Sequence, residues 1–154
     1  MKVSDILRVK GDGTLFTVDP TGRLADAVQT MASKDLGSLV VTEHGKLVGM
    51  LTFREVIQSV IQNAGALGDT TVRSAMDAHL MTCTPETDLD DVRRMMLERH
   101  SRYMPVTENQ QLVGVISFYD VAKAVVDSQN FENKMLKAYI RDWPSDAAEV
   151  GQTL

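Results

Sequence analysis

Apolar and polar residues follow two periodicities along this chain, and their order predicts a mixture of helices and strands. Leu24, Val28 and Met31 recur at the spacing of one helix face. Two β-rich runs follow, at 38–42 and 47–51, and the turn residues between them predict a hairpin. A further helix is predicted by a second apolar periodicity at Val56, Ile57, Val60 and Ile61.

The same string of elements occurs twice. An offset of 65 positions, the distance from Thr17 to Thr82, aligns the two copies without a gap. Roughly a third of the aligned positions are identical, which chance rarely produces over such a length. The matched pairs include Pro20 and Pro85, Leu24 and Leu89, Asp26 and Asp91, Met31 and Met96, Gly49 and Gly114, and Phe53 and Phe118. The second hairpin is predicted over 103–107 and 112–116.

Each copy has a hydroxyl residue and an acid at the junction between its second strand and its last helix. Thr52 precedes Glu55 by three positions, and Ser117 precedes Asp120 by three. This spacing predicts a capping box, in which the two side chains satisfy amide donors at the start of the helix.

The two copies together, with Met104-Pro105-Val106 opening the second hairpin, resemble the paired cystathionine β-synthase (CBS) domains of regulatory proteins, in their stand-alone bacterial form. The resemblance runs from about Val3 to about Asp127. It implies an α/β fold of the α+β type, with two β-α-β-β-α repeats packed around a pseudo-two-fold axis and two clefts between them. The expected division is a first repeat at 1–64, a second at 70–128, a C-terminal helix at 129–143 and a flexible tail at 144–154.

Members of this family commonly hold an adenosine-containing ligand in one or both clefts: AMP, ATP, NAD or S-adenosylmethionine. An acid in the first turn of a helix can accept both ribose hydroxyls, while the hydroxyl residue and the helix N-terminus face phosphate. AMP is the preferred candidate, as a regulatory ligand and not an obligatory cofactor.

The resemblance implies two unequal clefts. The first centres on Asp120 as ribose acceptor and Ser117 as phosphate partner. The residues expected to complete it are Ile116, Asp19, Leu24, Gly37, Ser38 and Leu39.

The second cleft departs from the family pattern, because Glu55 replaces the usual aspartate and is one methylene longer. Arg102, however, is the clearer cationic phosphate partner. The residues expected in this cleft are Thr52, Glu55, Thr84, Leu89, Arg102 and Tyr103. The sequence favours the Asp120 cleft for its stronger ribose acceptor and leaves open which cleft is filled.

Composition narrows the function classes. A net charge of −5 opposes binding to nucleic acid, and the chain has no apolar stretch long enough to span a membrane. Its single cysteine, Cys83, fits the reducing cytoplasm and is expected as apolar filler at the start of a strand. The three histidines lack metal-ligand spacing, so no metal site is expected, and without a nucleophile beside a base no enzyme activity is expected either.

After the second copy, an apolar stripe recurs at helical spacing within the C-terminal helix expected at 129–143, carried by Phe131, Met135, Tyr139, Ile140 and Trp143. Such a stripe must be covered, and we expect a homodimer contact there. Two functions fit the sequence. One is a nucleotide-sensing module that signals to an unidentified partner protein, and the alternative is an assembly module with vestigial clefts.

Overall fold

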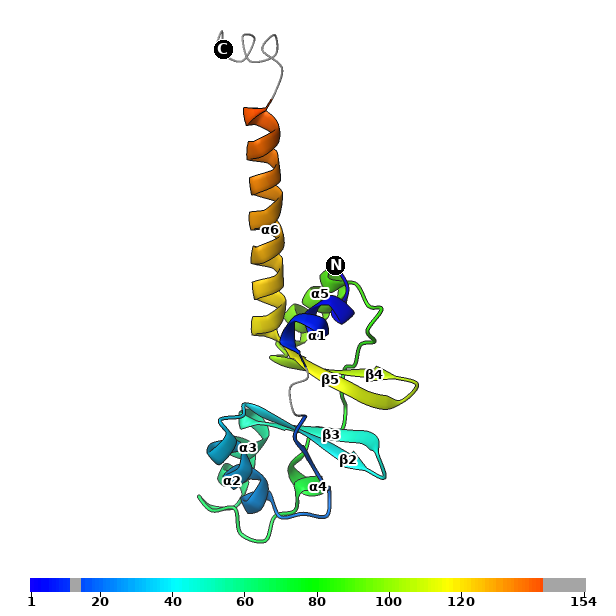
Figure 1. Cartoon of the computed structure of the whole chain (residues 1–154). Coiled ribbons are helices and arrows are strands. Elements are labelled where there is room, and N and C mark those ends of the chain that lie inside the picture. The colour runs from blue at the N-terminus through cyan, green and yellow to red at the C-terminus, as the bar shows by residue number, and fades with distance from the viewer. Residues whose placement is uncertain (12–14, 143–154) are drawn as a thin grey trace.

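The computed structural model describes residues 1–11 and 15–142. Its first half contains α1 (Val3–Lys10), β1 (Thr17–Val18), α2 (Leu24–Lys34), β2 (Ser38–Glu43), β3 (Lys46–Thr52) and α3 (Phe53–Gln62). Its second half contains α4 (Val72–Ala75), α5 (Leu89–Arg99), β4 (Tyr103–Glu108), β5 (Gln111–Ser117) and α6 (Phe118–Arg141). The two hairpins face each other at the centre, and the helices cover their outer sides (Figure 1).

The hairpins confirm the predicted duplication in detail. β2 pairs with β3 and β4 pairs with β5, both antiparallel, and both ladders are irregular at the same place, after Val41 and after Val106. Each hairpin closes through two residues with positive φ: His44 and Gly45 in the first, Asn109 and Gln110 in the second. A single pairing of Lys46 with Gln111 links them into a sheet with the order β1-β2-β3-β5-β4.

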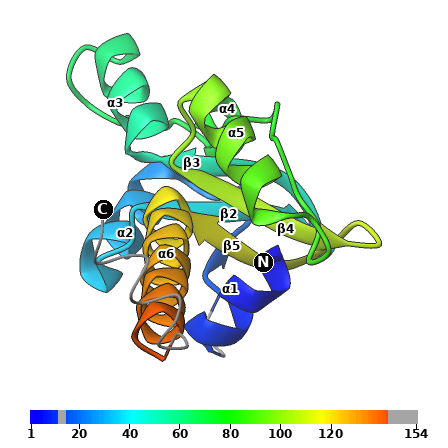
Figure 2. The same cartoon turned by 90° about the horizontal axis from the view of Figure 1, so that it is seen from above.

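The first helix of each half, α1 or α4, packs into the core of the other repeat, and we call this pair the leading helices. Val3 and Ile6 of α1 lie in the core of the second repeat, and Val72 of α4 lies in the core of the first. The helix α1 also contacts α6 and β5, its neighbours in Figure 2. The expected boundaries at 1–64 and 70–128 therefore divide the sequence but not the packing, because each half contributes its first helix to the other.

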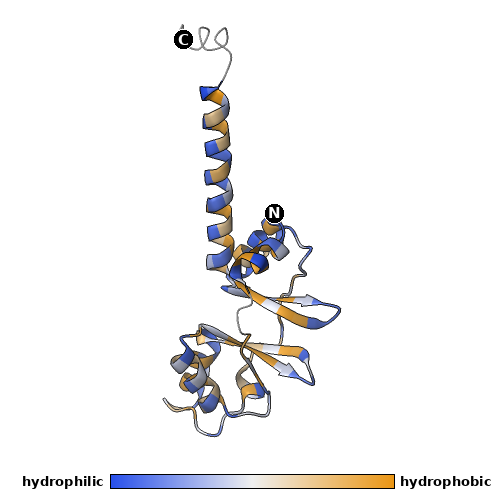
Figure 3. Ribbon diagram, viewed as in Figure 1, coloured by the Kyte–Doolittle hydropathy of each residue, from blue (hydrophilic) through white to orange (hydrophobic). Residues whose placement is uncertain are grey.

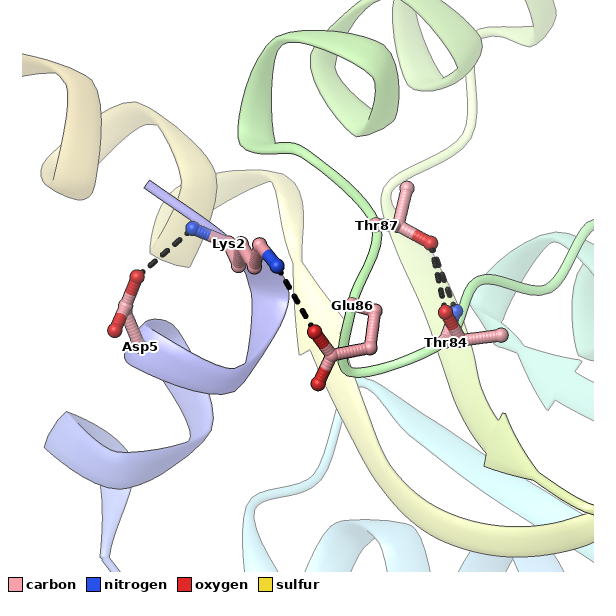
Figure 4. Close-up of polar contacts among 5 residues, drawn as sticks. All are labelled: Lys2, Asp5, Thr84, Glu86 and Thr87. Atoms are coloured by element: carbon pink, nitrogen blue, oxygen red, sulfur yellow. Dashed lines mark hydrogen bonds and ion pairs between the residues drawn. The ribbon is translucent and has the colours of Figure 1, made fainter.

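Matching backbone hydrogen bonds hold the two exchanged helices. The Val3 N–H donates to the Thr87 carbonyl and the Val72 N–H donates to the Gly22 carbonyl, both at 2.9 Å. Ser4 donates to Pro85 as Arg73 donates to Pro20, again at 2.9 Å in both. Beside α1, the Lys2 Nζ lies 2.9 Å from Glu86 Oε2 (Figure 4).

The two leading helices differ in length. The helix α1 has eight residues and reaches Lys10, whereas α4 ends after four at Ala75. Beyond α4 the backbone is extended at Met76, and Asp77 exchanges two hydrogen bonds with Met50 of β3. The last residue of the longer helix, Lys10, contacts Asp120 at the start of α6.

The last helix corrects one expectation. A helix ending near 128 and a separate helix from 129 were expected, but α6 runs unbroken for 24 residues from Phe118 to Arg141. No glycine or proline lies within it to interrupt the hydrogen-bond ladder. Its C-terminal half projects away from both repeats and carries hydrophobic bands along its length (Figures 1 and 3). Trp143 and the expected tail at 144–154 lie outside the described residues.

Candidate functional site

The strand-to-helix junction of the second repeat forms the predicted capping box. Ser117 has an extended backbone, and its Oγ accepts a hydrogen bond from the Asp120 N–H at 3.1 Å. In return, the Ser117 N–H donates to Asp120 Oδ2 at 2.8 Å. The exchange fixes the Asp120 carboxylate at the N-terminus of α6, where the helix dipole favours negative charge.

Lys10 contacts the same carboxylate from the end of α1. Its Nζ lies 2.8 Å from Asp120 Oδ2 and donates a second hydrogen bond to the Val115 carbonyl at 3.1 Å. Burial alone raises the pKa of Asp120, but the hydrogen bonds from Lys10 and Ser117 and the charge of Lys10 outweigh it. The pKa of the Asp120 carboxyl therefore lies below its ordinary value, and the group is ionised at neutral pH.

A cleft of about 670 Å³ lies beside this ion pair. Its walls come from the end of α1, from the residues just before β1, from the end of α2 through the first half of β2, and from the second hairpin, so both repeats contribute. The lining residues are Leu7, Lys10, Gly11, Leu15, Phe16, Asp35, Leu36, Gly37, Ser38, Val40, Tyr103, Val113, Gly114, Val115 and Ser117. Of the residues expected at the Asp120 cleft, Gly37, Ser38 and Ser117 line it. Asp120 is not among the lining residues and is joined to the cleft through its contacts with Lys10 and Ser117.

Tyr103 was expected in the other cleft, and the structure places it in this one. Its hydroxyl lies against Gly37 so closely that a Cβ at position 37 would overlap it. Gly37 is therefore a site of close approach between the repeats, where no larger residue fits without moving the tyrosine ring.

Four other residues expected in this cleft lie elsewhere. Leu39 and Ile116 point into the two cores, because side chains alternate along a strand and their neighbours Ser38 and Ser117 face the cleft. Leu24 is fully buried in the first core. Asp19 is exposed at a turn, where it accepts hydrogen bonds from the Thr21 side chain and N–H, and these lower its pKa.

The first-repeat junction is closed on itself. Glu55 is only 8% exposed, and its Oε1 accepts hydrogen bonds from the Thr52 N–H at 3.0 Å and the Thr52 hydroxyl at 2.8 Å. Both contacts are internal to the cap. Glu55 thus acts as the capping residue of α3.

The remaining residues expected in the second cleft have different surroundings. Thr84 bonds to Thr87 on the exposed loop before α5 (Figure 4). Leu89 belongs to the second core. Arg102 is exposed and makes no ion pair with any residue in 1–11 or 15–142. A phosphate-binding role for Arg102 stays a prediction.

Sequence reasoning missed Lys10, the one basic residue among those that line the cleft. The signal available was the apolar spacing of Val3, Ile6 and Leu7, which marks a helix with one buried face and so a lysine held near the body of the protein. The long-range partner of that helix was not readable from the spacing.

Other candidate chemistry is limited. Cys83 is buried beside Val106, as expected for apolar filler, and burial raises the pKa of its thiol to about 11. Within the part of the chain that the structure describes, no three His, Cys, Asp or Glu residues are grouped as metal ligands would be. No helix in that same part is long and apolar enough to cross a membrane.

Comparison with known proteins agrees with the duplication of one unit along the chain. A family model described as the CBS domain matches residues 3–62 and 72–127. The chain belongs to the CBS domain family, as a CBS pair.

Individual relatives support the assignment. The chain is 31% identical over 147 residues to the CBS domain-containing protein CBSX3, mitochondrial, of Arabidopsis thaliana, covering 90% of this chain and 71% of that protein. The solved structure of a protein with CBS domains from Burkholderia ambifaria has a TM-score of 0.77 and 30% identity to this chain. The match covers 84% of this chain and 96% of that one. CBSX2 in complex with AMP shares the fold, at a TM-score of 0.70 and 22% identity, over 83% of this chain and 98% of that one.

The Lys10–Asp120 ion pair predicts a pH-dependent contribution to stability. The pKa of Asp120 is lowered in the folded protein, so this contribution is complete above the ordinary aspartate pKa of about 3.9 and is lost as the pH falls through the lowered value. We expect Asp120→Asn to reduce the free energy of unfolding by about 1 kcal/mol at neutral pH, since Lys10 is partly exposed. Urea unfolding from neutral pH to the acid limit of folding measures the difference. A difference that does not shrink in acid would contradict the ion pair.

Proposed function

We propose that this chain is a non-catalytic regulatory module that binds an adenosine-containing ligand, AMP first among the candidates, in the cleft beside Asp120. The observation that carries the proposal is the Asp120 carboxylate, ionised and fixed at the start of α6 by Ser117 and Lys10, two residues that line an inter-repeat cleft. Both hydrogen bonds to the carboxylate from the described residues go to Oδ2, which leaves Oδ1 to accept ribose hydroxyls.

The size and lining of the cleft support this ligand class. Its volume falls within the range of roughly 300 to 1,000 Å³ that small-molecule sites occupy. Phe16, Val40 and Val113 supply apolar surface for a base, while Ser117 still has its hydroxyl proton to donate, because its Oγ serves the cap as an acceptor. The AMP complex of CBSX2, a protein of the same fold, supports the choice of AMP.

The Asp120 cleft is proposed over the Glu55 junction for a physical reason. Each acid accepts two hydrogen bonds at one carboxylate oxygen, but Glu55 is nearly buried and bonds only within its cap among the described residues, whereas Asp120 is paired with Lys10, which lines the cleft. Asp120 can accept the hydroxyls at Oδ1 without losing its cap.

A ligand in this cleft would touch α1 and both hairpins at once. Because α1 belongs in sequence to one repeat and in packing to the other, binding would bias how the repeats sit together, and a partner protein in contact with either could respond. The cytoplasm is proposed as the compartment, supported by the single free thiol of Cys83.

The ribose contact gives the sharpest test of this function. We expect the unaltered chain to bind AMP and to bind its 2′-deoxy analogue at least about tenfold more weakly, because one charge-assisted hydrogen bond is lost. AMP at about a hundred times its dissociation constant should raise the melting temperature by several degrees, the equivalent of about 2.7 kcal/mol. Titration calorimetry and thermal melting measure both effects.

Two variants test whether AMP binds in the Asp120 cleft or at the Glu55 junction. Asp120→Ala should weaken AMP binding by about tenfold or more, while Glu55→Gln, at the matching position of the first repeat, should leave it within about threefold. Equal affinity for AMP and the 2′-deoxy analogue would rule out the ribose contact. No binding of any adenine nucleotide would favour the assembly module with vestigial clefts.

We also propose that the chain forms a homodimer through the projecting half of α6. Phe131, Met135, Tyr139 and Ile140 are each about 60% exposed there, and Leu136 is 57% exposed. Apolar side chains at such density on one helix favour a second copy as the cover, because identical faces pair in a two-fold contact.

The dimer proposal is tested by placing a charge in this face. Met135→Glu should convert a dimer to a monomer, because an unpaired carboxylate would be buried. Lys137→Glu, which the helical spacing puts on the far side, should leave the dimer intact. Light scattering after size exclusion reports the mass. A monomeric unaltered chain, or a dimer that tolerates Met135→Glu, would contradict the proposal.

A further inference from the structure

The charge of the cleft depends on one residue. Among the lining residues that the structure describes, Lys10 is the only base and Asp35 the only acid, and Asp120 adds a second negative charge through its contact with Lys10. Without Lys10 the cleft would therefore carry two carboxylates and no compensating cation. Such a site repels anions and favours neutral or cationic ligands.

The position of the Lys10 ammonium leaves it able to bind an anion. Its side chain is 42% exposed, whereas the Asp120 side chain beside it is 16% exposed. An ammonium has three donors, and two of these are used, one by Asp120 Oδ2 and one by the Val115 carbonyl. Among the described residues nothing accepts the third, which is free for a group in the cleft.

The short distance between Lys10 Nζ and Asp120 determines where an anionic group of the ligand would bind. Lys10 Nζ lies 2.8 Å from the carboxylate proposed to hold the ribose. A ligand whose sugar rests on Asp120 Oδ1 brings its 5′ substituent within reach of a flexible four-carbon side chain. The ion pair need not break, because the third donor turns toward the ligand while the other two stay in place.

We propose that Lys10 is the phosphate-binding residue of the Asp120 cleft, and that it makes the cleft select adenosine ligands with an anionic 5′ phosphate over neutral adenosine. This inference rests on the proposed function, since it assumes that adenosine binds beside Asp120. In this proposal a residue of α1, a helix outside both hairpins, distinguishes charged from uncharged ligands.

The test compares two ligands that differ only in the phosphate. We expect the unaltered full-length chain to bind AMP about 10- to 100-fold more tightly than adenosine in titration calorimetry at low salt. Lys10→Met keeps the length of the side chain and removes its charge. It should weaken AMP binding about 10- to 100-fold and change adenosine binding by less than about threefold.

Two further variants serve as controls. Lys10→Arg keeps the charge and should retain most of the preference for AMP. Lys46→Met removes a lysine from the exposed end of β3, outside the cleft, and should leave both affinities unchanged. The preference for AMP should also weaken as salt is raised, which can be read from the unaltered chain even if Lys10→Met fails to fold.

The outcomes separate the two proposals. If the unaltered chain binds AMP and adenosine equally, or if Lys10→Met binds AMP as well as the unaltered chain, the role of Lys10 is overturned and the nucleotide site stands. If Lys10→Met loses both ligands alike, Lys10 only supports the fold of the site, and the inference is again overturned. If the unaltered chain binds neither ligand, the proposed function fails and this inference fails with it.

Discussion

The exchange of leading helices between the two repeats is the constraint on which the rest of the structure depends. Each core is completed by a helix from the other half of the sequence, Val3 and Ile6 in one direction and Val72 in the other. Matched backbone hydrogen bonds hold both helices at their entry. Neither repeat can bury its apolar face alone, so the two halves are held at a fixed relation and a cleft persists between them.

The same exchange makes the clefts unequal. The helix α1 runs four residues longer than α4, and its last residue, Lys10, reaches the carboxylate at the start of α6. After α4 the chain instead turns extended and pairs with β3. The two repeats thus have similar strand-to-helix junctions. Because α1 is the longer of the two leading helices, its Lys10 places a positive charge beside the acid at the junction of the second repeat. Ser117 and Asp120 differ from Thr52 and Glu55 by small changes in side chain, but their surroundings differ in net charge.

The sequence predicted the features that local chemistry determines. Hairpins, helix starts and both capping boxes are confirmed, because turn residues, alternation and the hydroxyl-to-acid spacing act within a few residues. Lys10 and the exchanged helices were missed, because they depend on contacts between positions about a hundred residues apart, as between Lys10 and Asp120. Leu39 and Ile116 were expected in the cleft from the family resemblance, but they only adjoin the lining residues Ser38 and Ser117, and strand alternation turns them inward. The apolar stripe beyond 128 was correctly identified as helical, but it was assigned to a separate helix, whereas it continues α6.

The account depends most on the geometry at Asp120, and a crystal structure of the full chain with AMP tests that geometry directly. The account predicts the ribose hydroxyls within hydrogen-bond distance of the Asp120 carboxylate, the phosphate at Lys10 Nζ, and the base against the apolar wall of the cleft. Clear density for AMP at the Thr52–Glu55 junction, with the Asp120 cleft filled only by water, would contradict it.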